Sequence, residues 1–122
     1  MKTALLLIAH GSRNAEANAD LVALADGLRE SAEYPIVEPA YLELAQPTID
    51  DAGRKCVMQG AECVILLPYF LSPGVHARID LQVHCDRLAS TYADVTFLLA
   101  KPIGAHPLLT EIVLQRAREC KG

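Results

Sequence analysis

Four short runs of apolar residues alternate along the chain with longer segments in which apolar and polar residues are mixed. Each run is almost continuously apolar, which is typical of strands buried on both faces of a parallel sheet. The runs are Thr3–Ala9, Ile36–Leu42, Cys63–Leu67 and Val95–Leu99. Pro39 interrupts the second run, and proline is tolerated within a sheet mainly on an edge strand. The second run is therefore predicted to be an edge strand.

The segments between the runs carry apolar residues at the spacing of amphipathic helices. Helices are predicted over residues 14–31, from about Pro47 to Gly60, over residues 75–91, and from Pro107 to about Glu119. Proline suits the first turn of a helix, and glycine suits the position just after its end. The residues expected to pack in the core are Ala17, Leu21, Leu24, Ala25 and Leu28 in the first helix, Ile49, Ala52, Val57 and Met58 in the second, and Ile79, Val83 and Leu88 in the third.

The regular alternation of strands and helices predicts an α/β fold. We expect an open, mostly parallel four-stranded sheet with helices on both faces, similar to a flavodoxin-like unit. In the strand order 2-1-3-4, the first and third strands are central. Ligands of such sheets bind at the carboxyl ends of the strands, where the order reverses. The loops that follow the first and third runs are therefore the first places to look for a site.

The composition of the chain further narrows the class of protein. The chain has 122 residues, of which 52% are hydrophobic and 21% are charged. These values fit one folded domain over residues 1–122. The net charge is −4 and the basic residues are scattered, which argues against nucleic-acid binding through a basic face. No run approaches the ~20 apolar residues of a membrane span. The apolar start continues into His10 without a cleavage motif, so we expect a buried strand rather than a signal peptide.

The cysteines are Cys56, Cys63, Cys85 and Cys120, and none of them forms a C-x-x-C pair. This pattern favours reduced thiols and a cytoplasmic protein. Cys63 lies inside a predicted strand and is expected to be a small core residue.

Candidate chemistry lies directly after the apolar runs, at His10, Glu43, His76 and His106. Taken singly, each has an ordinary interpretation: a histidine bonded to loop backbone or facing solvent, or a surface carboxylate. Taken together, two imidazoles and a carboxylate from three loops at one sheet edge suit a divalent metal such as Co²⁺, Fe²⁺, Ni²⁺ or Zn²⁺. The spacing is non-local, so only the fold can bring these groups together.

Four segments resemble the class II chelatases of the CbiX and SirB type. They are Ala9–Arg13, Ala40–Pro47, Leu67–His76 and Ile103–Pro107. Those lyases insert Co²⁺ or Fe²⁺ into sirohydrochlorin on the way to cobalamin or sirohaem. The resemblance implies a sirohydrochlorin metal chelatase in its small, single-unit form, which acts as a homodimer with sites near the subunit interface. It favours Co²⁺, because the small form is associated with cobaltochelatases.

The resemblance also implies roles for particular residues. His10 and His76 match the catalytic and metal-binding histidines, and Glu43 matches the acidic residue that completes the metal site. The divalent metal is then a substrate, and no permanent cofactor is implied. His106 falls in a recurrent motif, although a ligand role does not follow from that.

The carboxylates of such a tetrapyrrole need cations or helix N-termini near the site. Arg13 and Arg78 follow the two site histidines and are candidates for this role, with a solvated helix face as the alternative. Ser12 is a substrate-binding candidate at the start of a helix, which Ser12, Arg13 or Asn14 would cap. Tyr69 is a candidate for packing against the macrocycle, and Phe70 is a candidate for either the macrocycle or the core.

His76, Asp80 and His84 are spaced to share one stripe of a helix. Asp80 is a candidate partner for a site histidine. His84 would lie ~12 Å from His76 at the rise of an α-helix, which is too far for the same metal. A surface or interface histidine is therefore expected at position 84.

Other classes of protein fit less well. A flavodoxin-type electron carrier would need a Ser/Thr-rich phosphate loop after the first strand. A histidine phosphatase would have arginine before His10, where this chain has Ala9. A receiver domain would need an acidic cluster with an aspartate ending a strand. A carrier that binds metal or tetrapyrrole without catalysing insertion stays open.

Overall fold

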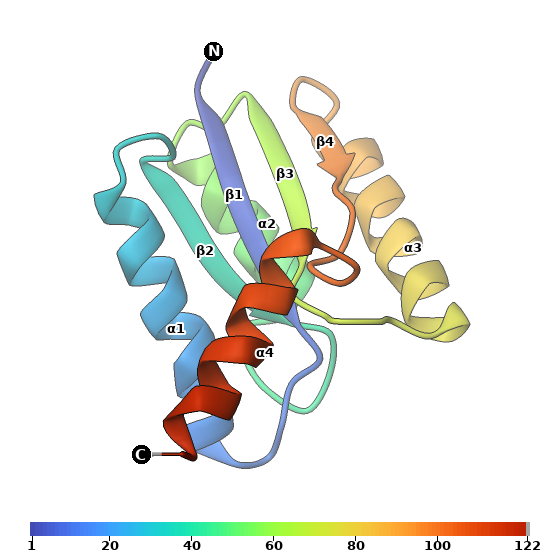
Figure 1. Ribbon diagram of the computed structural model, residues 1–122. Helices are drawn as coiled ribbons and strands as arrows, with labels where there is room; N and C mark the ends of the chain where they lie inside the picture. Colours follow the sequence, from blue (N-terminus) through green and yellow to red (C-terminus); the bar gives the residue numbers. More distant parts are fainter. Residues whose placement is uncertain (122) are drawn as a thin grey trace.

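The computed structural model describes residues 1–121 and has the predicted alternation of strands and helices (Figure 1). The elements are β1 (Thr3–Ala9), α1 (Ala15–Glu30), β2 (Ile36–Tyr41), α2 (Ile49–Met58), β3 (Cys63–Pro68), α3 (Val75–Thr91), β4 (Thr96–Leu99) and α4 (Pro107–Glu119).

The expected position of Pro47 is wrong, because this residue precedes α2 instead of opening it. The Pro47 carbonyl accepts a hydrogen bond from the Tyr41 backbone N–H at 3.0 Å, which ties it to the end of β2. Thr48 then caps the helix through its hydroxyl, which accepts from the Asp51 N–H at 3.1 Å. Gly60 follows the helix end with a φ of 95°, as glycine at such a position is expected to do.

The sheet is parallel throughout, with the strand order β2-β1-β3-β4, which confirms the predicted topology. β1 and β3 are central, and every residue from Ala4 to Ile8 is buried. β2 lies at an edge, which confirms the interpretation of Pro39.

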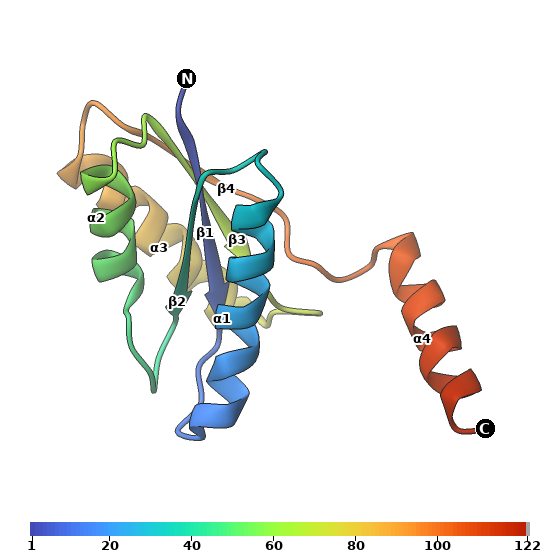
Figure 2. The same ribbon diagram turned by 90° about the vertical axis from the view of Figure 1, so that its left-hand side faces the viewer.

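Helices cover both faces of the sheet (Figure 2). α2 and α3 pack on one face around Leu6, Ile8 and Leu66. α1 packs on the other face, where Leu21 and Ala25 meet side chains of β1 and β2. Alternate residues of each central strand therefore point into two separate apolar layers.

Several residues expected in the core are exposed instead. In α3 the buried stripe is Leu81, Cys85 and Leu88, while Ile79 and Val83 face solvent. Successive helical residues turn by about 100°, so Ile79 points about 200° away from Leu81. The rotation of the helix about its axis is set by its packing on β4. In the other two helices, Ala17, Leu24 and Met58 are also exposed.

All four cysteines are free thiols, but only Cys120 is exposed. Burial raises the pKa of Cys85, and it raises the pKa of the Cys56 thiol to about 12.

Because the thiolate is the reactive form of cysteine, we expect the native protein to react with a thiol reagent at Cys120 alone. Denaturation should expose the other three. Rapid modification of a second thiol in the native state would contradict this burial pattern.

No helix within residues 1–121 combines the length and apolar character required to cross a bilayer. α4 differs from the other helices, because none of its residues is buried and it stands away from the sheet (Figure 2).

Candidate metal site

The loops after β1 and β2 lie side by side at the carboxyl edge of the sheet. The Leu42 N–H donates to the Ala9 carbonyl at 2.9 Å, and the Glu43 N–H donates to the His10 carbonyl at 3.0 Å. These two bonds extend the strand pairing past the ends of the strands. As a result, His10 and Glu43 are held beside each other by backbone.

Gly11 makes this close approach possible. Its φ is 103°, and a Cβ at this position would lie 1.8 Å from the Glu43 carbonyl oxygen. Only glycine fits both the backbone conformation and the space. The glycine after the first site histidine therefore has a geometric role in placing that histidine.

His10 and Glu43 are in direct contact through their side chains. His10 Nε2 lies 2.7 Å from Glu43 Oε1, and the two side chains are 56% and 57% exposed. The Phe70 ring packs edge-on against the imidazole, with ring centroids 6.3 Å apart. The pair is thus supported on one side and open to solvent on the other.

Residues of α3 complete a pocket of about 290 Å³ around this pair. The pocket is lined by His10, Leu42, Glu43, His76, Ala77, Asp80 and His84. The fold therefore brings together the two histidines and the glutamate singled out in the sequence, and it adds Asp80 from the same helix stripe. In this arrangement, no group of three or more His, Cys, Asp or Glu side chains within residues 1–121 is already positioned to hold a metal.

His84 lines this pocket as well, on the helix stripe that it was predicted to share with His76 and Asp80. It is partly buried, its Nδ1 lies 3.7 Å from Asp50 Oδ1, and this nitrogen makes no hydrogen bond. The signal for its place in the pocket was the four-residue spacing from Asp80.

The substrate-binding candidates have different surroundings. Arg13 and Arg78 are exposed near the two site histidines along the chain. Ser12 is engaged locally: its hydroxyl accepts from the Asn14 N–H at 3.0 Å, and its own N–H donates to Asn18 Oδ1 at 3.0 Å. Asn14 is the residue that caps α1.

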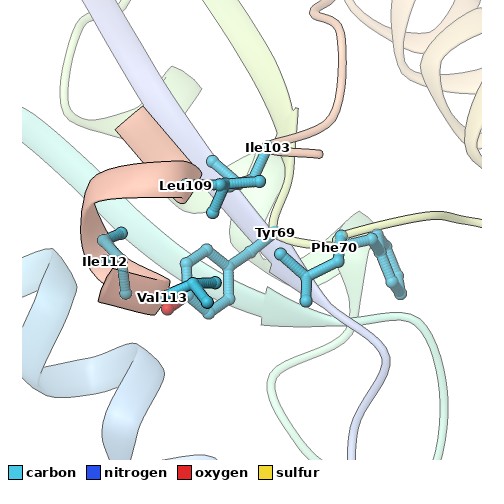
Figure 3. Close-up of a pocket in the computed structure, with 7 residues that line it drawn as sticks. Tyr69, Phe70, Ile103, Leu109, Ile112 and Val113 are labelled. Atoms are coloured by element: carbon cyan, nitrogen blue, oxygen red, sulfur yellow. The ribbon is translucent and has the colours of Figure 1, made fainter. Parts of the chain in front are cut away.

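A second, apolar cavity of about 560 Å³ lies between the loop after β3 and α4 (Figure 3). We call it the α4 groove; it is lined by Tyr69, Phe70, Leu71, Ile103, Leu109, Ile112 and Val113. Tyr69 is half-exposed there. Phe70 lines the groove and also contacts His10, so the groove and the polar pocket share a wall.

His106 is separate from the polar pocket. It is the N-cap of α4, where its Nδ1 accepts a hydrogen bond from the Leu108 N–H at 3.1 Å. Its position after β4 and before a proline accounts for this capping role.

These features define a class of protein: a doubly wound parallel α/β domain with an imidazole–carboxylate pair at the carboxyl edge of its sheet, on the loops after β1 and β2. The chain belongs to the CbiX family, whose model matches residues 4–120.

Named relatives come in two lengths. A chloroplastic sirohydrochlorin ferrochelatase of Arabidopsis thaliana is 39% identical over 95% of this chain and 52% of its own length. The chain thus spans about half the length of the first curated relatives it matches. A sirohydrochlorin cobaltochelatase of Methanocaldococcus jannaschii is 30% identical over 93% of this chain and 96% of its own length.

A solved structure has the same fold. It is the sirohydrochlorin chelatase SirB from Bacillus subtilis subspecies spizizenii in complex with cobalt, with a TM-score of 0.89 and 33% identity. The match covers 98% of this chain and 51% of that one.

Proposed function

We propose that this protein inserts a divalent metal into a sirohydrochlorin-type tetrapyrrole, with the metal as substrate and no permanent cofactor. The observation that carries the proposal is the contact between His10 and Glu43 in a pocket that His76 also lines. Membership of the CbiX family supports it, because relatives of both lengths are named sirohydrochlorin chelatases.

The metal would bind by separating His10 from Glu43. The atoms now in contact, an imidazole nitrogen and a carboxylate oxygen, are both metal-binding atoms, and His76 is our candidate for the third ligand. Three protein ligands leave positions open for water or for the incoming macrocycle. Because both side chains of the pair are more than half exposed, the metal can enter and leave without unfolding the loops.

Metal insertion also requires the macrocycle to lose two pyrrole protons. Each protein atom that releases the metal regains a free lone pair and can accept a proton. The site then loses the two positive charges of the metal and gains the two protons, so its total charge is unchanged. An ordinary imidazole has a pKa of about 6.5, so it can serve first as a ligand and then as a base near neutral pH.

The pigment would approach from the side of the apolar groove. Tyr69 offers a ring surface there, while the Phe70 ring packs against His10 and the core beneath α2 and α3. Arg13 and Arg78 are exposed and available to pair with carboxylates of the substrate. Ser12 is a weaker candidate, because its hydroxyl already accepts a local hydrogen bond.

We further propose that the protein works as a single-domain unit paired with a second copy, and that Co²⁺ is its first metal. The Methanocaldococcus relative of matching length, named a cobaltochelatase, supports both the single unit and the metal. Because other relatives are named ferrochelatases, Fe²⁺ is the alternative to Co²⁺ as the inserted metal. A cytoplasmic location stays a prediction, since one relative is named chloroplastic.

The test is an anaerobic absorbance assay with purified protein, sirohydrochlorin and either Co²⁺ or Fe²⁺. We expect the protein to accelerate metallation above the uncatalysed rate, faster with Co²⁺. Faster insertion of Fe²⁺ would reassign the metal. Binding of metal or pigment without any acceleration would replace the enzyme with a carrier.

A further inference from the structure

The polar pocket extends along α3 beyond the residues proposed for metal insertion. His76, Asp80 and His84 follow one another at four-residue spacing, and all three line the pocket. Side chains four residues apart on a helix lie on the same face, one turn from each other. His84 lies ~12 Å from His76 along the helix axis, which is too far to share a metal ion with it. The proposed insertion site therefore leaves the imidazole of His84 without a role.

The surroundings of His84 are those of a metal-binding histidine. Its Nδ1 is buried, makes no hydrogen bond within residues 1–121, and lies 3.7 Å from Asp50 Oδ1. Arg87 holds that carboxylate from the other side, with its Nη1 3.4 Å from Asp50 Oδ2. Because Nδ1 faces Asp50, Nε2 is the ring nitrogen left for the pocket. A histidine that binds a metal through one nitrogen usually donates the other N–H to a carboxylate, and Asp50 is placed to accept it.

Asp80 offers a second metal-binding atom, one turn before His84. Its side chain is exposed and lines the same pocket. Among the described residues that line this pocket there are two carboxylates, Glu43 and Asp80, and neither lysine nor arginine. The lining therefore favours a cation. Two ligands at this spacing on one helix face can hold the same divalent metal, with water in the remaining coordination positions.

The metal-free insertion site gives such a pair a use. His10 Nε2 and Glu43 Oε1 are in contact at 2.7 Å, so an arriving ion must be held nearby while this contact opens. Asp80 lies between His84 and His76 on the helix stripe, one turn from each. Its carboxylate can stay on the ion while His76 replaces His84 as the imidazole ligand.

We propose that Asp80 and His84 form a second divalent-metal site, which receives the hydrated ion and passes it to His10, Glu43 and His76. This inference rests on the proposed function and adds the route taken by its metal substrate. The ion exchanges water for protein ligands in two stages, first at the pair on α3 and then at the insertion site. Only bonds to the metal form and break, and its oxidation state does not change.

The first test measures binding of Co²⁺ alone, without any tetrapyrrole. The double variant His10→Ala/His76→Ala lacks two proposed ligands of the insertion site, and we expect it still to bind Co²⁺ at the pair on α3. Proton NMR of this complex should show a paramagnetically shifted, solvent-exchangeable imidazole N–H signal from His84. Adding His84→Ala should remove the signal, and adding Asp80→Asn should weaken Co²⁺ binding at least about tenfold.

Asp86→Asn is the matched control for Asp80→Asn. It makes the same substitution at another exposed position of α3, where the carboxylate accepts from Gln82 Nε2 at 2.9 Å outside the pocket. We expect it to leave Co²⁺ binding unchanged. Because Asp80 is exposed, its variant is expected to fold, and because His76 is absent from the background, a loss of binding cannot act through that histidine. If the double variant binds no Co²⁺, or binds it equally after Asp80→Asn, the second site does not exist.

The second test asks whether this site supplies the metal for insertion. In the anaerobic metallation assay, His84→Ala is expected to raise the KM for Co²⁺ about tenfold with little change in kcat, because it weakens capture of the ion and leaves the insertion ligands in place. An unchanged KM would overturn the delivery route. A protein that binds Co²⁺ at Asp80 and His84 but does not accelerate metallation would support the second site and contradict only the proposed function.

Discussion

His10→Ala and His76→Ala are each expected to slow protein-dependent insertion of metal into sirohydrochlorin by at least about 100-fold. Each substitution removes a candidate ligand from the pocket, and His10→Ala also leaves Glu43 without its partner at 2.7 Å. The same imidazoles are proposed to accept the protons of the macrocycle, so both functions are lost together. The measurement is the anaerobic rate of metallation, with binding of the metal alone followed in parallel.

His106→Asn is the matched control for this experiment. It also removes an imidazole, but His106 caps α4 and lies outside the polar pocket, and asparagine can still cap the helix. We expect its metallation rate to equal that of the wild type. If His10→Ala or His76→Ala retained the wild-type rate, metal insertion would not pass through this pocket.

Gly11→Ala is expected to destabilise the protein by at least about 2 kcal/mol and to disrupt the site at the same time. The new Cβ would collide with the Glu43 backbone carbonyl at 1.8 Å, and the φ of 103° is unfavourable for alanine. The loops after β1 and β2 must then separate, which parts His10 from Glu43. Urea denaturation measures the change in the free energy of unfolding, and the metallation rate reports the loss of the pair.

Gly27→Ala makes the same substitution at a position where the added methyl group has room. Gly27 lies within α1, and a Cβ there would meet no atom within 4 Å. We expect this variant to be more stable than the wild type by about 0.5–1 kcal/mol, because alanine favours helix over glycine. Equal effects of the two substitutions would refute the geometric role assigned to Gly11.

Much of the site could be predicted from sequence because its residues follow the ends of strands. The apolar runs are local patterns, and parallel strands place their carboxyl ends at one edge, so His10 and Glu43 were expected to be neighbours. The contact between their side chains could not be predicted. It depends on the backbone bonds that join the two loops and on the room that Gly11 provides.

The sequence by itself determined the order of the elements, the parallel sheet and the loops that carry the imidazoles, because these follow from short-range periodicity and right-handed crossovers. Only the tertiary structure decided which way each helix faces. The rotation of α3 on the sheet exposes Ile79 and Val83 and brings His84 into the pocket. The backbone at Gly104 approaches the Leu71 carbonyl too closely for a side chain, and α4, which follows it, stands away from the sheet (Figure 2). Both outcomes depend on contacts between residues distant in sequence, which a periodic pattern does not record.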